Sequence, residues 1–290
     1  MDLEITLDQV CNMINKEKII IFVLIVLITI FFIFISFKSN FLKSNYNFKI
    51  YFFNAGKADA ILISNNSKNI LIDTGEEENV NDILNYFINN NITKLDYLIV
   101  THFDKDHVGG ASSIIDNIEI GEVIESSYIK ESEYYSNYIN SLSKKSITPK
   151  TITGDYTISL GDLIININGP EEIFSNNESN NSSLIVSITY KNNNFLFMGD
   201  SEELRISDFI NKNSKTYDFI KIPYHGNYLS NLDSLLNETK VNYSVMTCSN
   251  EEGCEDETID LVNKYSINNY MTKNGGITLL SNGYDIIISQ

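Results

Sequence analysis

Four side chains that can bind a metal ion lie within one short segment of the sequence. Residues 101–110 read THFDKDHVGG, and the four are His102, Asp104, Asp106 and His107. The segment follows a largely apolar run at 95–100, which predicts that it begins where a buried strand ends. Alternate residues of an extended chain point the same way, so the first pair can bind one ion while the second pair reaches another. We expect the two glycines to let the backbone turn tightly into the next helix.

Two further candidate ligands stand alone, each directly after a predicted strand. Asp200 ends the stretch FMGD, and His225 lies within KIPYHG. The chain has only three histidines, and all of them belong to these motifs. A lone histidine is more often structural than a ligand, but three at strand ends beside aspartates favour a metal site.

At these residues the sequence resembles the metallo-β-lactamase superfamily, whose signature is H-x-[HD]-x-D-H. More closely, it resembles the hydrolase domain of ComEC-type competence proteins, over about residues 48–290. Supporting stretches are FNAGKADA at 53–60, LIDTG at 71–75, NSSLI at 181–185 and PYHGN at 223–227. The His/Asp signature is highly specific, and the other stretches only support it.

The resemblance implies two divalent ions, Zn²⁺ or Mn²⁺, and a role for each ligand. His102 and Asp104 would bind the first ion, Asp106, His107 and His225 the second, and Asp200 would bridge the two. Asp106 and His225 are the candidate catalytic residues, and His225 could serve as a general acid if only one ion binds. Asp59 and Asp73 would orient the ligating histidines, as such histidines usually require. The alternative, that these two aspartates only form turns, is about as good.

The sequence departs from the superfamily pattern at several positions. Where many relatives have a further histidine, this chain offers only Asn180, Asn181 and Ser182, a feature that the ComEC-type group shares. The first ion would therefore be held more weakly. Asp104 replaces a histidine of the lactamases and makes that position richer in oxygen, which suits Mn²⁺ or Fe²⁺ beside Zn²⁺. Tyr224 replaces a histidine, so a substrate contact made there is in doubt. The competence channel is missing.

A pair of cations would supply hydroxide at neutral pH and neutralise charge on an attacked oxygen, so we expect hydrolysis, with a phosphodiester favoured. No phosphate-binding G-x-x-x-x-G-K-[ST] motif competes with this interpretation. Residues 1–45 are neutral, so the whole net charge of -17 lies on the remaining domain. An acidic domain repels polyanions, which leaves a hydrolase of small esters, such as phosphocholine or lactone substrates, nearly as good as a nuclease. A non-catalytic surface binding module is the third possibility, and no protein partner can be inferred.

The elements that must position these residues alternate along the chain. We expect strands at 49–53, 60–63, 69–72, 95–100, 156–159, 163–167, 184–189, 195–198, 219–222 and 243–246, helices at 80–87, 131–143, 202–211 and 257–264, and a closing hairpin at 277–288. Paired strands followed by strands alternating with helices predict an α+β fold, and the family resemblance specifies a metallo-β-lactamase-like αββα sandwich.

The N-terminal part predicts a membrane anchor. Residues 19–37 carry no charge, and as a helix they would reach roughly 28 Å at ~1.5 Å per residue, close to the ~30 Å hydrocarbon layer. We therefore expect a tail at 1–18, one transmembrane helix at 19–37, a linker at 38–47 and a hydrolase domain at 48–290. Lysines flank both ends of the apolar segment, so charge gives no clear orientation. A short tail favours a single-pass protein of the cell membrane with the domain outside the cytoplasm.

Two cysteines bear on the compartment. Cys248 and Cys254 could form a loop disulfide in an oxidising compartment, or they could be two free thiols.

Overall fold

The computed structural model describes residues 21, 23–32, 46–170 and 179–290, and its contacts divide the chain into two units, Met1–Tyr46 and Asn47–Gln290. In the first unit, residues 21 and 23–32 are helical. The predicted anchor at 19–37 therefore lies partly outside the described residues. Among those that are described, no helix is long and apolar enough to cross a membrane.

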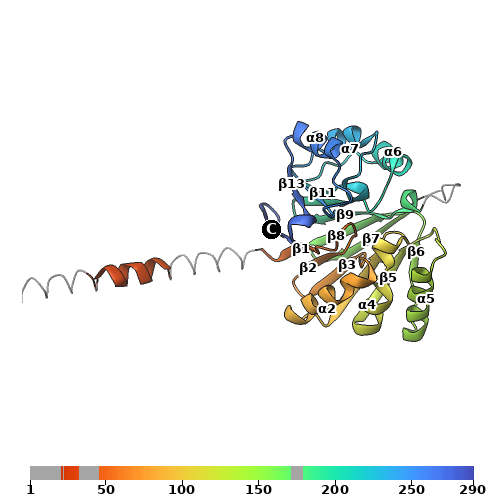
Figure 1. Ribbon diagram of the computed structural model, residues 1–290, viewed down its shortest axis with the longest axis horizontal. Helices are drawn as coiled ribbons and strands as arrows, with labels where there is room; N and C mark the ends of the chain where they lie inside the picture. The colour runs from red at the N-terminus through yellow and green to blue at the C-terminus, as the bar shows by residue number, and fades with distance from the viewer. Residues whose placement is uncertain (1–20, 22, 33–45, 171–178) are drawn as a thin grey trace, which may run out of the picture. The chain divides into compact units, whose positions relative to one another are not determined.

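The second unit contains two β-sheets (Figure 1). The first sheet has eight strands in the order β15-β14-β1-β2-β3-β4-β5-β6. Their bounds are β1 Phe48–Phe52, β2 Ile61–Asn65, β3 Lys68–Ile72, β4 Lys94–Val100, β5 Glu119–Ser126, β6 Lys150–Ile152, β14 Ile277–Ser281 and β15 Ile286–Ser289. From β3 to β6 neighbouring strands are parallel, while the remaining pairs of this sheet are antiparallel.

The second sheet has seven strands in the order β13-β12-β11-β10-β9-β8-β7. Their bounds are β7 Asp155–Leu160, β8 Leu163–Asn168, β9 Ile185–Tyr190, β10 Asn193–Phe197, β11 Phe219–Lys221, β12 Tyr243–Met246 and β13 Asn268–Met271. The strands from β7 to β10 are antiparallel and those from β10 to β13 are parallel.

Helices cover the outer face of each sheet. The bounds are α2 Val80–Asn89, α3 Lys105–Val108, α4 Ala111–Asn117, α5 Glu133–Lys145, α6 Glu203–Lys212, α7 Leu232–Thr239 and α8 Asp256–Lys264. In Figure 1, α2, α4 and α5 lie along the first sheet, and α6, α7 and α8 lie along the second.

Three layers of apolar side chains hold this arrangement together. One cluster, which includes Phe52, Ile99, Phe197 and Phe219, lies between the two sheets. A second packs α2, α4 and α5 on the first sheet, and a third packs α6, α7 and α8 on the other. Burial of alternate residues in β1 and β8 is what period-two patterning predicts for strands with one face in a core. The predicted α+β two-sheet sandwich is therefore confirmed.

The parallel parts of the two sheets decide where functional side chains meet. Carboxyl ends of parallel strands lie at one edge of a sheet, where open α/β sheets usually carry their sites. The segments that follow β3 and β4 in the first sheet lie close to those that follow β10, β11 and β12 in the second, as the contacts described below establish.

Candidate metal centre

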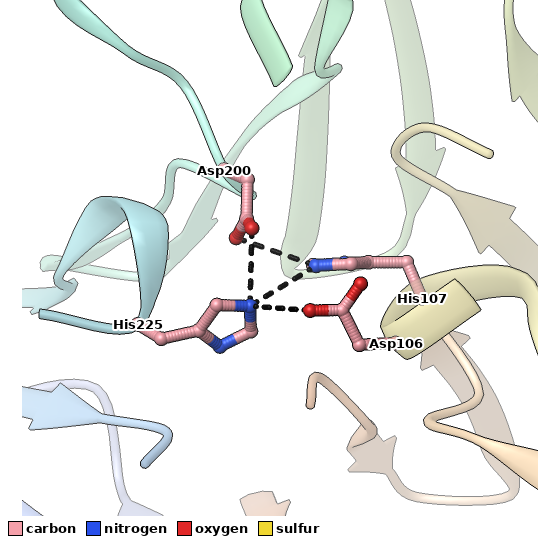
Figure 2. A group of neighbouring side chains, drawn as sticks. All are labelled: Asp106, His107, Asp200 and His225. Atoms are coloured by element: carbon pink, nitrogen blue, oxygen red, sulfur yellow. Dashed lines mark hydrogen bonds and ion pairs between the residues drawn. The ribbon is translucent and has the colours of Figure 1, made fainter. Parts of the chain in front are cut away.

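Four side chains from three different strand ends form a compact cluster (Figure 2). Asp106 and His107 lie on α3, just after β4, while Asp200 follows β10 and His225 follows β11. One ligand atom from each lies within 4.8 Å of those of the others. His225 Nε2 is 3.2 Å from Asp106 Oδ2 and 3.0 Å from Asp200 Oδ2, and His107 Nε2 is 3.3 Å from Asp200 Oδ1.

Hydrogen bonds on the far side of each ring fix which nitrogen faces the cluster. His107 Nδ1 donates to Asp73 Oδ2 at 2.8 Å, and His225 Nδ1 donates to the Thr247 carbonyl oxygen at 3.0 Å. The two Nε2 atoms therefore face each other, 3.3 Å apart. When the rings are neutral, each Nε2 carries a lone pair, and a proton or a metal ion at this place offsets the repulsion between the two. Such an outer hydrogen bond is the usual companion of a metal-ligating histidine.

The spacing and charge of the cluster fit a divalent ion. Four N and O ligands with bonds of about 2.1 Å in a tetrahedron lie roughly 3.4 Å apart, close to the separations above. Burial lowers the pKa of His107, but the carboxylates of Asp200, Asp73 and Asp106 outweigh it and hold this pKa well above its ordinary value. Burial raises the pKa of Asp200, but His225 and His107 hold it well below its usual range. The pocket therefore favours positive charge among ionised carboxylates, which a proton or a metal ion can supply.

A buried lysine lies beside this cluster. Lys221, the last residue of β11, is fully buried, and its Nζ lies 2.6 Å from Asp59 Oδ2 and 3.6 Å from Asp200 Oδ1. It also donates to the Gly199 carbonyl oxygen at 3.1 Å. Burial lowers the pKa of Lys221, but Asp59 and Asp200 outweigh it, so the lysine stays charged. Thr247 Oγ1 donates to the other oxygen of Asp59, so this carboxylate connects the lysine to the residue that orients His225.

His102 and Asp104, the predicted ligands of the first ion, lie next to the cluster and outside it. The rings of His102 and His107 have centroids 4.0 Å apart. His102 Nε2 is buried and has no hydrogen-bond partner within the described part of the chain. Burial and the neighbouring His107 lower the pKa of His102, which keeps it in the neutral form that binds metals. Asp104 is engaged by Lys130, whose Nζ lies 2.7 Å from its Oδ2.

The backbone turns into α4 at Gly109 and Gly110, as expected, and these two glycines also serve close packing. Gly109 and Gly110 have φ values of -57° and -84°, which any residue can adopt. A Cβ on Gly110 would lie 2.6 Å from the Thr74 carbonyl oxygen, and one on Gly109 would lie 3.1 Å from that of Gly75. The missing side chains let α3 and α4 approach the loop that carries Asp73.

His225 lies in a turn with unusual backbone geometry. Tyr224 and His225 have φ values of 50° and 55°, in the left-handed region that side chains usually avoid. The Cys254 amide donates to the His225 carbonyl oxygen at 3.0 Å, and the structure joins Cys248 and Cys254 in a disulfide. The loop that this disulfide closes directly follows Thr247, so it holds the backbone of His225 while Thr247 holds the ring.

The family model of the metallo-β-lactamase superfamily matches residues 54–248, which include every residue of this centre. The chain belongs to the metallo-β-lactamase superfamily. Members of this superfamily are metal-dependent hydrolases, and the ligand cluster lies where the family signature predicts it. Nothing in the comparisons identifies the ComEC-type group, which stays a prediction.

Solved structures share the fold at low sequence identity. The metallo-β-lactamase fold protein YhfI from Bacillus subtilis is 12% identical with a TM-score of 0.56, over 81% of this chain and 100% of that one. The CmlA β-hydroxylase E377D mutant is 14% identical with a TM-score of 0.53, over 81% of this chain and 54% of that one. These similarities concern the fold alone. No curated protein sequence matches the chain.

The structure thus gathers the predicted ligands of the second ion together with Asp200, the predicted bridge. It also places Asp59 and Asp73 against the ligating histidines, as expected for residues that orient ligands. Where relatives have a further histidine, the Asn181 side chain accepts from the Arg205 backbone amide and the Asn180 amide donates to Glu202.

Three residues of the centre, Lys221, Thr247 and Lys130, have no role predicted from the sequence. A lysine in the otherwise apolar run FIKI at 219–222 was an available signal for Lys221. Nothing in the sequence marks Thr247 or Lys130, because each reaches the centre from a distant loop.

Proposed function

We propose that this metallo-β-lactamase superfamily chain is a metal-dependent hydrolase that cleaves phosphodiester bonds. The observation that carries the proposal is the cluster of Asp106, His107, Asp200 and His225, in which the Nε2 atoms of two histidines and the oxygens of two carboxylates converge. Zn²⁺ or Mn²⁺ bound there would lower the pKa of water and neutralise charge on an attacked phosphoryl oxygen. The family signature adds His102 and Asp104, the predicted ligands of the first ion, beside this cluster.

The chain's own residues would have distinct tasks in this reaction. Asp73 and Thr247 hold the two rings so that Nε2 faces the reacting groups. Asp106 is the most open of the cluster, with 21% of its side chain exposed against 0–4% for the other three. Burial raises the pKa of Asp106, but His107 and the hydrogen bond from His225 hold it low, so its carboxylate can accept a hydrogen bond from an attacking water.

The substrate class rests on ligand chemistry and charge. Oxygen-rich ligands at the first position suit Mn²⁺, and two cations can clamp a phosphoryl group between them. The net charge of -17 acts against a long polyanion and favours a small diester. Small esters without phosphorus, such as lactones, are the second candidate, because the same charge does not repel them.

The proposal is tested with bis-p-nitrophenyl phosphate and the full-length chain. We expect Mn²⁺-dependent turnover that falls by about a hundredfold or more in Asp200→Asn, because Asp200 faces both histidines of the cluster. Asp116→Asn, which changes an exposed carboxylate paired with Lys144, is the matched control and should retain full activity.

Substrate length is decided by a salt titration. Cleavage of DNA should weaken steeply with added salt because phosphate contacts release counterions, whereas turnover of a small diester should change little. Lactone hydrolysis without diester turnover would favour the second candidate. A protein shown to hold metal that turns over none of these substrates would contradict the hydrolase and leave a binding module.

We also propose that residues 19–37 anchor the chain in the cell membrane with the domain outside the cytoplasm. The uncharged sequence supports the anchor, and the disulfide between Cys248 and Cys254 supports an oxidising compartment. Protease added to intact cells should then degrade the domain. Cleavage only after the cells are permeabilised would show that the orientation is wrong.

A further inference from the structure

The two predicted metal positions differ in how complete they are. The second position has two histidines and two carboxylates whose ligand atoms lie within 4.8 Å of one another. The first position has His102, whose Nε2 is buried without a partner in the described part of the chain, and Asp104. Among the described residues, neither of them lies in a group of three or more candidate ligand atoms within 4.8 Å of one another.

Asp104 already has a cation beside it. Lys130 lies between β5 and α5, and its Nζ is 2.7 Å from Asp104 Oδ2. Lys130 therefore lies where a second metal ion would need the same carboxylate.

The ion pair between Lys130 and Asp104 is partly exposed to solvent, so it can open. The side chain of Lys130 is 46% exposed, while that of Asp104 is 22% exposed. A partly exposed ion pair is weak and screened, and lysine is a compact charge on a flexible stem that can swing into solvent. Lys130 engages Oδ2 of Asp104, while Oδ1 is buried without a partner in the described part of the chain. A divalent ion at the first position would therefore keep Oδ1 as a ligand, share the carboxylate with Lys130 and be repelled by the charge of Lys130.

We propose that the chain holds one divalent ion tightly, at Asp106, His107, Asp200 and His225, and that Lys130 competes with a second ion for Asp104. This inference rests on the proposed metal site and adds a residue that controls how many ions the site holds. Lys130 belongs to no motif that the sequence singles out.

The test is a calorimetric titration of the metal-free, full-length chain with Mn²⁺. Wild type should bind one ion tightly, at the second position, and another more weakly, at the first position. Lys130→Ala should leave the tight position unchanged and tighten the first position about tenfold, through loss of the competing ion pair and of the repulsion. Lys130→Glu should tighten the first position further, because it adds a carboxylate next to Asp104.

Two further variants test whether the effect comes from net charge alone and whether it acts through Asp104. Lys144→Ala removes an equal charge from an exposed pair with Asp116 and should leave both sites unchanged. Adding Asp104→Ala to Lys130→Ala should remove the increase in metal affinity, because the carboxylate for which Lys130 and the ion compete is then missing.

The outcomes separate this inference from the hydrolase proposal. Equal affinity at the first position in wild type and Lys130→Ala, or weaker binding there in Lys130→Ala, would overturn it. No Mn²⁺ binding by wild type would overturn both proposals. Binding as described with no diester turnover would leave this inference intact and contradict the hydrolase.

Discussion

Saturating Mn²⁺ should raise the unfolding temperature of the full-length protein by about 10 °C over a sample with chelator, and His107→Ala should remove most of this shift. An ion present at a thousand times its dissociation constant stabilises the folded state by about 4 kcal/mol, and 1 kcal/mol moves a domain of this size by roughly 2–4 °C. Loss of a residue that only hydrogen-bonds a ligand typically weakens metal affinity by up to about a hundredfold. Loss of the ligand His107 itself should weaken it more. Differential scanning calorimetry with and without metal measures the shift within each variant.

His102→Ala is the matched control for this experiment. Both histidines are fully buried and their rings are neighbours, so the two variants remove the same group from similar surroundings. Only His107 belongs to the four-residue cluster. His102→Ala should therefore keep most of the metal-dependent shift. A shift retained by His107→Ala and lost by His102→Ala would show that the tight ion lies at the first position instead.

Most of the fold could be predicted because its strands show their burial in their patterning. The strand at Tyr243–Met246 has the bounds that the sequence predicted, and several others differ by one or two residues. The strand β5, at Glu119–Ser126, was missed. Its first half has two glutamates and a glycine and is not buried, and only its second half is buried. β13 was missed because it is a short polar strand at the edge of a sheet, where little core packing shapes the sequence.

The candidate site could be predicted only where the residue type itself indicates a metal ligand. Histidines and aspartates at strand ends indicated Asp106, His107, Asp200 and His225, which the sheets then bring together. Partners that come from another sheet or loop carry no such mark. The sequence marks Lys221 only by its place in the apolar run FIKI, and nothing in it shows that Asp59, from the turn between β1 and β2, is its partner.

Lys221 is the residue whose loss should destabilise the fold most among those around the centre. Its ammonium group is fully buried and neutralises the equally buried Asp59 at 2.6 Å, with Asp200 at 3.6 Å. Taking one partner out of a buried ion pair leaves a charge that neither water nor protein compensates. Asp59 is additionally fixed by the hydrogen bond from Thr247, so it cannot turn toward solvent without releasing His225.

Lys221→Met, which keeps the length of the side chain, should lower the free energy of unfolding by about 3–5 kcal/mol in chelator, or roughly 10 °C in melting temperature. Adding Asp59→Asn should restore much of this loss, because the amide oxygen still accepts from Thr247 and no buried charge is left unpaired. Lys264→Met, which breaks an exposed pair with Asp233, should change stability little. Urea unfolding of wild type, Lys221→Met, Asp59→Asn and the double variant measures the coupling, with Lys264→Met as the control. Losses that simply add in the double variant would show that Lys221 stabilises the fold through its packing and not through the charge of Asp59.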